Sequence, residues 1–333
     1  MNGFVVGVSG GIDSAVTSTL CAMTGYPVNA LNMPICQAAD QVSRAARHIQ
    51  WLAARYPTVE GVTVDLTPVF ESLKRALPEA IQDDLSMANA RSRLRMLTLY
   101  GFSTHHRLLV AGTGNKVEDF GVGFYTKYGD GGVDLSPIAD LMKSEVYALA
   151  EAMGIIDEII QAPPTDGLWS DNRSDERQIG AAYAELEWAM AYEAGNGDEA
   201  SLDPRQRDVL AIFRKFNRSN RHKMVPIPVC TIPKQLKEDP RNWKQPSNQH
   251  WNLKTGSEIC TSRQYPAPMN LPEKKYFKPW QTTSSATWIT WKAGSMSGKS
   301  VEKSATKCWL RWFPTKRRSA KRRLPFSRQS AKM

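Results

Sequence analysis

The sequence predicts an α/β fold in which helices flank a doubly wound parallel sheet, followed by a basic tail. Three observations support this prediction. Short apolar runs alternate with segments of helical periodicity over the first half of the chain, the first apolar run ends in a glycine-rich turn, and the composition changes near residue 234. Alternation of this kind builds βαβ units, whose parallel strands place a ligand site beyond their carboxyl ends.

The expected elements follow one another at a regular pitch. Residues 4–8 are apolar and mostly β-branched, which favours a buried strand, and residues 15–23 carry apolar side chains at helical spacing. Strands are expected at 4–8, 28–33, 62–66 and 107–111, and helices at 15–23, 40–56 and 87–102. The loop at residues 9–14 therefore lies at the carboxyl end of the first strand.

The charge distribution divides the chain into two parts. Residues 1–233 carry 21 basic and 28 acidic side chains, a net charge of −7, whereas residues 234–333 carry 22 and 5, a net charge of +17. We therefore predict a domain at 1–233 and an extension at 234–333. Seven of the ten tryptophans but only eight Leu, Ile and Val residues lie in the extension, without periodicity, so it is expected to be disordered.

The extension leaves one alternative function open. Two basic triplets, at residues 316–318 and 321–323, follow Trp309 and Trp312. Lysine and arginine attract phosphates and tryptophan stacks on bases, so this stretch could bind nucleic acid.

Cysteine usage and hydropathy indicate the compartment. The five cysteines are scattered without a C-x-x-C pair, which argues against a disulfide framework or a zinc site and favours reduced thiols. The N-terminus enters an apolar strand without a basic leader, and no window reaches the roughly 18 apolar residues of a membrane span. A soluble, cytoplasmic protein is expected.

The loop Ser9-Gly10-Gly11-Ile12-Asp13-Ser14 has the residue types of a phosphate site. Two glycines let backbone N–H groups approach an anion, the following helix N-terminus adds partial positive charge, and Ser9 and Ser14 can donate hydroxyl hydrogen bonds. Asp13 would repel a bare phosphate, so its presence indicates a Mg²⁺ ion between carboxylate and phosphate oxygens.

This run resembles the pyrophosphatase loop of the N-type ATP pyrophosphatases, which have an adenine nucleotide alpha hydrolase-like fold. The resemblance implies that ATP adenylates a carbonyl-type oxygen, that pyrophosphate leaves, and that a nitrogen or sulfur nucleophile displaces AMP. The loop alone points only to the superfamily, so a member acting on a nucleotide or on tRNA stays an alternative.

A second segment resembles the ammonia-dependent NAD synthetases. It comprises G-T-G-N-K-V-E-D at 112–119, G-F-Y-T-K-Y-G-D-G-G-V-D at 123–134, and Lys143. Residues 89–96, 162–169 and 220–223 fit the same family in the same order, so the resemblance covers about 230 residues. Taken singly these residues fit ordinary surface and turn roles, and only their joint order points to this family.

The resemblance implies a ligase that joins ammonia to deamido-NAD with ATP as co-substrate and Mg²⁺ as cofactor. Asp13 and Lys143 would be catalytic, and Asp13 and Glu118 would bind the metal. ATP contacts are implied for Gly7, Val8, Ser9, Gly10, Gly11, Ile12, Asp13, Ser14, Thr113, Lys143 and Thr165. Deamido-NAD contacts are implied for Arg93, Lys127, Asp134, His222 and Lys223.

The family pattern also implies partners. A homodimer is expected, and because no amidase domain is fused, ammonia arrives free or from a separate glutamine amidase. Only eight residues precede Ser9, fewer than in the family, and this leaves a third alternative, an inactive truncated synthetase.

Overall fold

The computed structural model describes residues 1–37, 39–164, 175–195, 198–229 and 234–238. The chain divides into two units, one containing Met1–Pro226 and one spanning Ile227–Gly294. The second unit is described only at 227–229 and at the short helix α10, Lys234–Glu238. The elements that form the site belong to the first unit.

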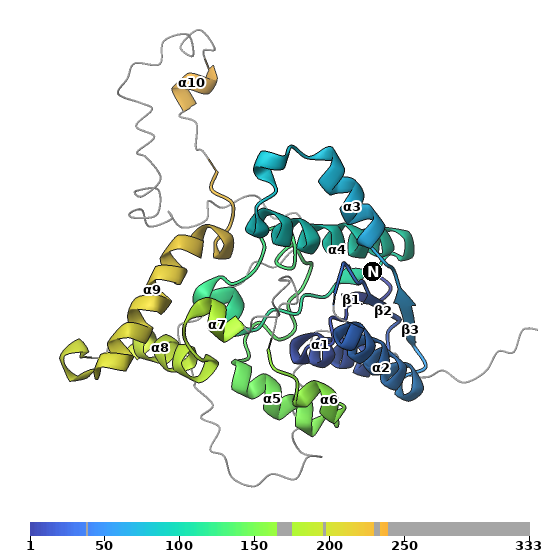
Figure 1. Ribbon diagram of the computed structural model, residues 1–333, viewed down its shortest axis with the longest axis horizontal. Helices are drawn as coiled ribbons and strands as arrows, with labels where there is room; N and C mark the ends of the chain where they lie inside the picture. The colour runs from blue at the N-terminus through green and yellow to red at the C-terminus, as the bar shows by residue number, and fades with distance from the viewer. Residues whose placement is uncertain (38, 165–174, 196–197, 230–233, 239–333) are drawn as a thin grey trace, which may run out of the picture. The chain divides into compact units, whose positions relative to one another are not determined.

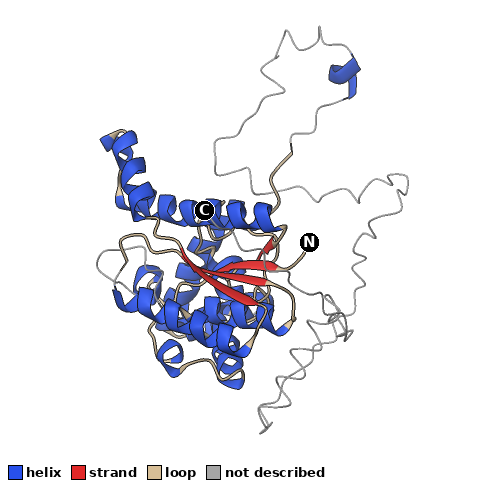
Figure 2. Cartoon of the chain, turned by 90° about the vertical axis from the view of Figure 1, so that its right-hand side faces the viewer, coloured by secondary structure: helices blue, strands red, loops and turns tan. Residues whose placement is uncertain are grey.

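A four-stranded parallel sheet forms the centre of the first unit (Figure 2). It consists of β1 (Phe4–Gly7), β2 (Val28–Asn32), β3 (Val59–Thr63) and β4 (Leu109–Val110), in the order β3-β2-β1-β4. The chain moves outward from β1 to β3 and then crosses to the other side of β1. The strand order therefore reverses beside β1, and this switch point is where doubly wound folds bind ligands.

Helices cover both faces of the sheet (Figure 1). On one face α1 (Ile12–Met23) and α2 (Ala39–Arg55) pack on a core that includes Phe4, Val6 and Leu52. On the other face α3 (Thr67–Ala76) and α4 (Asp84–His106) pack on a core that includes Val5 and Phe70. Successive strand residues point to opposite faces, which is why both faces of β1 are apolar.

The remaining helical elements complete the first unit. They are the π-helix η2 (Val117–Val122), α5 (Lys143–Ala152), α6 (Asp157–Ile160), α7 (Asp175–Ile179), α8 (Tyr183–Gly195), α9 (Pro204–Met224), and the 3₁₀ turns η1 (Glu79–Ile81) and η3 (Glu199–Ser201). α5 and α6 pack on α1, whereas η2, α8 and α9 share a separate apolar cluster. η2 thus links the sheet to the pair of helices α8 and α9.

The predicted fold class is confirmed, and several boundaries differ from the prediction. The third strand is Val59–Thr63 and not 62–66, because Val59 pairs with Val28 and the register of β2 fixes the rest. The first helix begins at Ile12, directly after the loop, and not at residue 15. α4 is longer than the predicted 87–102, since the Asp83 side chain accepts a hydrogen bond from the Ser86 N–H and caps an earlier start.

Within the described ranges, no helix is both long enough and apolar enough to cross a membrane.

Candidate functional site

The loop after β1 forms a tight arch in front of α1. Gly10 adopts a left-handed backbone with φ of 84°, and a Cβ there would lie 2.9 Å from the carbonyl oxygen of Gln41. The Ser14 hydroxyl donates to the Gly11 carbonyl at 2.9 Å and accepts from the Ser9 N–H at 3.2 Å. Gly11, the N-cap of α1, has no side-chain cap. The first N–H groups of α1 are therefore available to bind an anion such as a phosphate.

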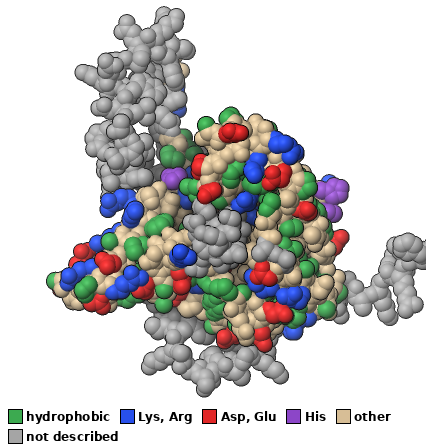
Figure 3. All heavy atoms as spheres, viewed as in Figure 1, with side chains coloured by type: hydrophobic (Ala, Val, Ile, Leu, Met, Phe, Trp, Pro, Cys, Tyr) green, Lys and Arg blue, Asp and Glu red, His purple; other side chains and the backbone are tan. Residues whose placement is uncertain are grey.

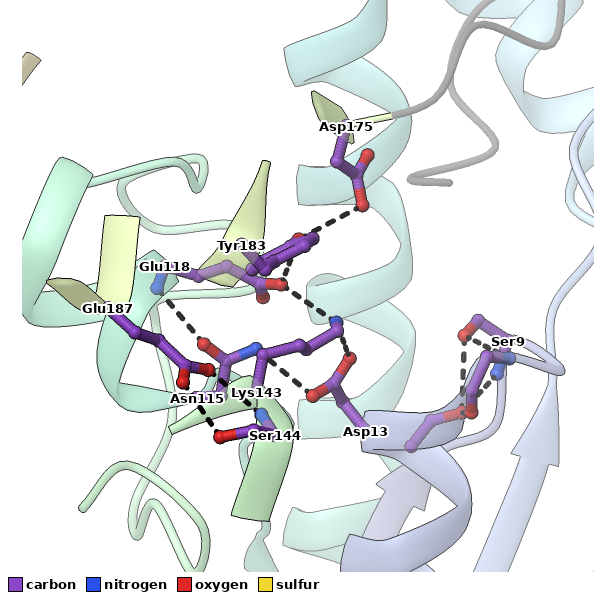
Figure 4. A network of polar contacts seen from close by, with 11 residues as sticks. Ser9, Asp13, Asn115, Glu118, Lys143, Ser144, Asp175, Tyr183 and Glu187 are labelled. Carbon is purple, nitrogen blue, oxygen red and sulfur yellow. Dashed lines mark hydrogen bonds and ion pairs between the residues drawn. The ribbon is translucent and has the colours of Figure 1, made fainter. Parts of the chain in front are cut away.

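Two carboxylates converge on one ammonium group beside this loop (Figure 4). The Nζ atom of Lys143 lies 2.6 Å from Asp13 Oδ2 and 3.1 Å from Glu118 Oε1. Asp13 belongs to the first turn of α1, Glu118 to η2, and Lys143 is the first residue of α5. The Lys143 side chain is only 4% exposed, so three elements meet at a buried ion triad.

Asn115 and Tyr183 hold this triad in place. The fully buried Asn115 donates from Nδ2 to Asp13 Oδ1 at 3.1 Å and accepts the Glu118 N–H at Oδ1, also at 3.1 Å. The Tyr183 hydroxyl donates to Glu118 Oε1 at 2.6 Å, and the Lys143 ammonium lies 4.6 Å from the centre of its ring. Each carboxylate is therefore fixed by a neutral donor as well as by the lysine.

The electrostatics keep the lysine charged. Burial lowers the pKa of Lys143, but the negative charges of Asp13 and Glu118 outweigh it and raise that pKa above its ordinary value. Burial, together with the charge of Glu118, raises the pKa of the nearby Asp119 to about 8. Asp119 is therefore largely protonated near neutral pH and adds little negative charge beside Glu118.

A cavity of about 240 Å³ opens over the loop and the triad. Most of the predicted ATP and metal residues line it: Gly7, Val8, Ser9, Gly11, Ile12, Asp13, Ser14, Thr113, Glu118 and Lys143. Gly10 belongs to the loop but is buried and does not line the cavity, and Thr165 lies outside the described residues. The sequence-based prediction gave no role to Arg95, which also lines the cavity and whose Nε donates to the Met33 carbonyl at 3.0 Å.

Four of the five predicted deamido-NAD residues lie together, although none of the five is among the residues that line the cavity. Arg93 Nε donates to the Lys127 carbonyl at 3.3 Å, and Lys127 Nζ donates to the His222 carbonyl at 2.7 Å. Lys223 Nζ donates to the carbonyls of Gly123 and Tyr125 at 2.9 and 2.7 Å. The structure therefore connects α4, the segment after η2 and the end of α9 in one basic cluster.

The fifth residue, Asp134, lies apart from that cluster. Its Oδ2 atom accepts the Val110 N–H of β4 at 2.8 Å, and its Oδ1 atom accepts the Tyr100 hydroxyl at 3.0 Å. These contacts tie the loop after β4 to the sheet, and they occupy both carboxylate oxygens.

Besides Arg95, the site contains Asn115, Tyr183 and Asp175, which also had no role in the sequence-based prediction. Asn115 lies inside the G-T-G-N run, so its neighbours were a signal for it. Tyr183 and Asp175 lie in segments without a recognisable motif. The Tyr183 hydroxyl lies 2.6 Å from Glu118 Oε1 and 3.3 Å from Asp175 Oδ2, so Asp175 is connected to Glu118 only through Tyr183.

Known proteins are similar to this chain in sequence and in fold. The family model of NAD synthase matches residues 1–226. The chain is 34% identical over 227 residues to the NH(3)-dependent NAD(+) synthetase of Carboxydothermus hydrogenoformans, covering 67% of this chain and 86% of that protein. It is 35% identical over 240 residues to the one of Syntrophomonas wolfei, covering 71% and 90%.

Solved structures agree with the sequence comparison. An NMN synthetase from Francisella tularensis superposes with a TM-score of 0.59 and 28% identity, covering 70% of this chain and 90% of that one. An NH3-dependent NAD synthetase from Campylobacter jejuni gives a TM-score of 0.56 and 26% identity, covering 69% and 90%. The match over residues 1–226 and these relatives show that the chain belongs to the NAD synthase family.

Proposed function

We propose that this chain catalyses the ATP-dependent amidation of deamido-NAD by ammonia, giving NAD, AMP and pyrophosphate. The observation that carries the proposal is the convergence of the loop, two carboxylates and Lys143 on one cavity in a member of the NAD synthase family. The same family membership favours NAD synthesis over the tRNA-directed and other N-type ATP pyrophosphatases.

The loop and Lys143 are suited to hold the triphosphate of ATP. The first backbone N–H groups of α1, from Ile12 to Ser14, supply donors that require no counter-charge of their own. The Lys143 ammonium adds a fixed positive charge at the mouth of the loop. Charge stabilisation of this kind is the main requirement for breaking the bond between the α- and β-phosphates.

The donor set of the triad fits Mg²⁺. Asp13 and Glu118 line the same cavity and both pair with the Lys143 ammonium, so their carboxylates are neighbours that could share a metal ion beside that ammonium. Over the described part of the chain, no group of three or more His, Cys, Asp or Glu side chains could hold a metal ion by itself. Mg²⁺ commonly takes one or two carboxylates plus substrate phosphates, and when bound it would neutralise phosphate charge.

The reaction then depends mainly on positioning. The nicotinate carboxylate of deamido-NAD attacks the α-phosphorus of ATP, pyrophosphate leaves, and ammonia attacks the resulting acyl adenylate and expels AMP. Arg93, Lys127, His222 and Lys223 form the basic cluster that we assign to the dinucleotide. The residues of the chain bind and orient both substrates, which accounts for a large part of such rate enhancements.

A second substrate is a candidate because of one comparison. The NMN synthetase from Francisella tularensis aligns over 90% of its length with this chain. The named product, NMN, contains the nicotinamide, ribose and phosphate of NAD without its adenosine monophosphate half. Nicotinic acid mononucleotide is therefore the competing substrate that a test must include.

The test is a reaction of purified protein with ATP, Mg²⁺, ammonium and either deamido-NAD or nicotinic acid mononucleotide. We expect NAD, AMP and pyrophosphate in equal amounts, with a higher kcat/KM for deamido-NAD. Faster amidation of the mononucleotide would shift the proposal to NMN synthesis, and a folded protein that forms neither amide would favour an inactive synthetase.

Two further proposals concern partners. We propose a homodimer, which sedimentation equilibrium can test at the concentration of the assay. We also propose that ammonia arrives free or from a separate amidase, so glutamine without an added amidase should not replace ammonium in the reaction.

A further inference from the structure

Side chains of α9 bind the consecutive carbonyl groups at the end of the π-helix η2. Asn217 Nδ2 donates to the Gly121 carbonyl at 2.8 Å, and Asn220 Nδ2 donates to the Val122 carbonyl at 2.9 Å. Lys223 continues the row by donating to the carbonyls of Gly123 and Tyr125. Residues 217, 220 and 223 lie three apart, so one face of α9 supplies the whole row of donors.

These carbonyl groups need partners from outside their own helix. The last carbonyls of any helix have no intrahelical N–H, and Gly121, Val122 and Gly123 are all buried. A buried carbonyl without a donor costs about 1–3 kcal/mol. α9 therefore replaces the hydrogen bonds that η2 cannot make after Gly123 turns left-handed with φ of 64°.

The end of η2 lies so close to α8 and α9 that a side chain in place of Gly121 or Gly123 would collide with them. A Cβ on Gly123 would lie 2.5 Å from Asn220 Cβ, and a Cβ on Gly121 would lie 2.8 Å from the sulfur of Met190. The fully buried Val117 and Val122 add apolar contacts with α8 and α9. Apolar contacts are not directional, whereas hydrogen bonds are, so the asparagine amides fix how η2 is rotated about its axis.

The rotation of η2 matters because η2 carries Glu118. The start of η2 is fixed by Asn115, whose Oδ1 accepts the Glu118 N–H, and its end is fixed by Asn217 and Asn220. The Phe124 N–H donates to the Glu118 carbonyl at 2.9 Å, so the carbonyls bound by α9 are directly linked to Glu118 through this turn. π-Helices are rare and concentrate at functional sites, where they re-aim a side chain.

We propose that Asn217 and Asn220 are positioning residues that aim the Glu118 carboxylate at the metal and phosphates of the proposed site. They do not touch the reacting atoms themselves. They act by holding the end of η2 against α9, the helix that also carries His222 and Lys223 of the basic cluster. The proposal rests on the proposed function, because it concerns the same metal ligand.

Metal binding measured without turnover tests the proposal. The double variant Asn217→Ala/Asn220→Ala is titrated with Mn²⁺ in the presence of α,β-methylene-ATP, whose α–β linkage resists cleavage, and free Mn²⁺ is measured by electron paramagnetic resonance. Loss of groups that orient a metal ligand typically weakens metal binding about 10–100-fold. We expect the Kd for Mn²⁺ to rise at least about tenfold while circular dichroism stays that of a folded protein.

Ser219→Ala is the matched control. Ser219 lies on the exposed side of α9, and its hydroxyl donates to the Lys215 carbonyl of its own helix at 2.9 Å. This variant should bind Mn²⁺ as the unaltered chain does. If the double variant does not fold, the single variant Asn220→Gln keeps the amide but displaces it by one methylene, and its Kd for Mn²⁺ should also rise.

The outcomes separate this proposal from the proposed function. A Kd for Mn²⁺ unchanged in a folded double variant, or unchanged in Asn220→Gln, overturns the role of the asparagines and leaves the proposed function intact. A lower melting temperature with unchanged metal affinity also overturns that role, since it indicates that the asparagines only stabilise the fold. No Mn²⁺ binding by the unaltered chain contradicts both proposals.

Discussion

Among single residues, Asp13, Glu118 and Lys143 form the buried ion triad beside the loop. Neither carboxylate has another cation within ion-pair distance in the described ranges, and Asn115 and Tyr183 contribute only neutral donors. Lys143 pairs with both carboxylates in the fold, and we propose that it also supplies positive charge to the phosphate site.

Lys143→Met removes the ammonium group but keeps an unbranched side chain of similar length. Without the ammonium, two buried carboxylates lose their counter-charge, and breaking a buried pair in this way costs about 3–5 kcal/mol. We also expect kcat/KM for ATP to fall at least about 100-fold, the usual loss for a group that stabilises developing charge. Urea denaturation and steady-state kinetics measure the two effects.

Lys116→Met is the control for that substitution. Lys116 Nζ also pairs with a carboxylate, Asp140, at 2.9 Å, but the Asp140 side chain is almost fully exposed. Exposed ion pairs contribute little to stability. Equal losses in the two variants would contradict a special role for Lys143.

The two glycines of the loop make a second matched pair. Gly10→Ala places a Cβ against the backbone of α2 and forces a non-glycine residue to φ of 84°, whereas a Cβ on Gly11 meets only the Ser9 hydroxyl at 3.4 Å. A strained backbone of this kind costs about 1–3 kcal/mol. We expect the melting temperature of Gly10→Ala to fall by several degrees, and that of Gly11→Ala to stay close to the unaltered value.

The melting temperatures of the two variants are measured by thermal unfolding, with circular dichroism as the signal. A Gly11→Ala protein as unstable as Gly10→Ala would show that the left-handed conformation is not what the loop requires of Gly10.

The residues that the sequence could predict are those within contiguous motifs. Ser9 to Ser14 and the run from Gly112 to Asp119 are local patterns, and the structure places nearly all of their predicted ATP and metal residues around one cavity. Tyr183 could not be found in this way. Its contact with Glu118 spans 65 positions and depends on how α8 packs, which no local spacing encodes.

At the scale of elements, the packing of α1 on α2 contains a buried histidine. His48 Nε2 lies 3.0 Å from the Ser18 hydroxyl, and the ring stacks on Trp51 with centroids 5.5 Å apart. Burial lowers the pKa of His48 from 6.5 to about 4. In the unfolded chain the imidazole regains its ordinary pKa, so the unfolded state takes up a proton between these values and the native state does not.

This difference predicts how stability depends on pH. The native state loses up to about 1.4 kcal/mol per pH unit as the pH falls from 6.5 toward 4, which amounts to about 2 kcal/mol between pH 7.5 and pH 5. His48→Gln removes this contribution. Urea denaturation at the two pH values should show the unaltered protein losing about 2 kcal/mol more than the variant.

His106→Gln, at the exposed end of α4, serves as the control and should follow the unaltered protein at both pH values. Identical pH dependence in the unaltered protein and His48→Gln would contradict a histidine that stays neutral in the packed helices.

Elements with strong local patterns were predictable, and those fixed by tertiary contacts were not. β1 is an apolar run, and β2 is buried along its whole length although it contains Asn29 and Asn32; the existence of both strands and their parallel pairing are confirmed. α3 was not predicted, because it has few apolar residues and Phe70 is its one buried side chain. The π-helix η2 was not predicted either, because its wide turn depends on donors from Asn217 and Asn220, about a hundred residues away.

At the scale of the whole molecule, charge is distributed unevenly along the sequence. On the face seen in Figure 3, acidic and basic side chains are interspersed over α8 and α9, where Arg214 pairs with both Glu193 and Glu199. The net charge of +17 belongs to residues 234–333. The family match ends at residue 226, so the proposed chemistry does not draw on the basic extension.

Removing residues 234–333 tests whether the reaction needs the basic extension. We expect the truncated protein to retain its melting temperature and its rate of NAD formation, because every residue assigned to the site lies before Met224. Binding to single-stranded RNA should be weak or absent in both proteins at physiological salt. Salt-sensitive RNA binding that disappears with the truncation would instead support a nucleic-acid role for the extension.

We propose that ATP adenylates the carboxylate of deamido-NAD in the cavity above the triad. The most direct test uses deamido-NAD with ¹⁸O in its carboxylate, together with ATP, Mg²⁺ and ammonium, and analyses the products by mass spectrometry. We predict that one ¹⁸O atom appears in the phosphoryl group of AMP and the other stays in the amide of NAD. Unlabelled AMP, or ADP with labelled inorganic phosphate, would contradict the account.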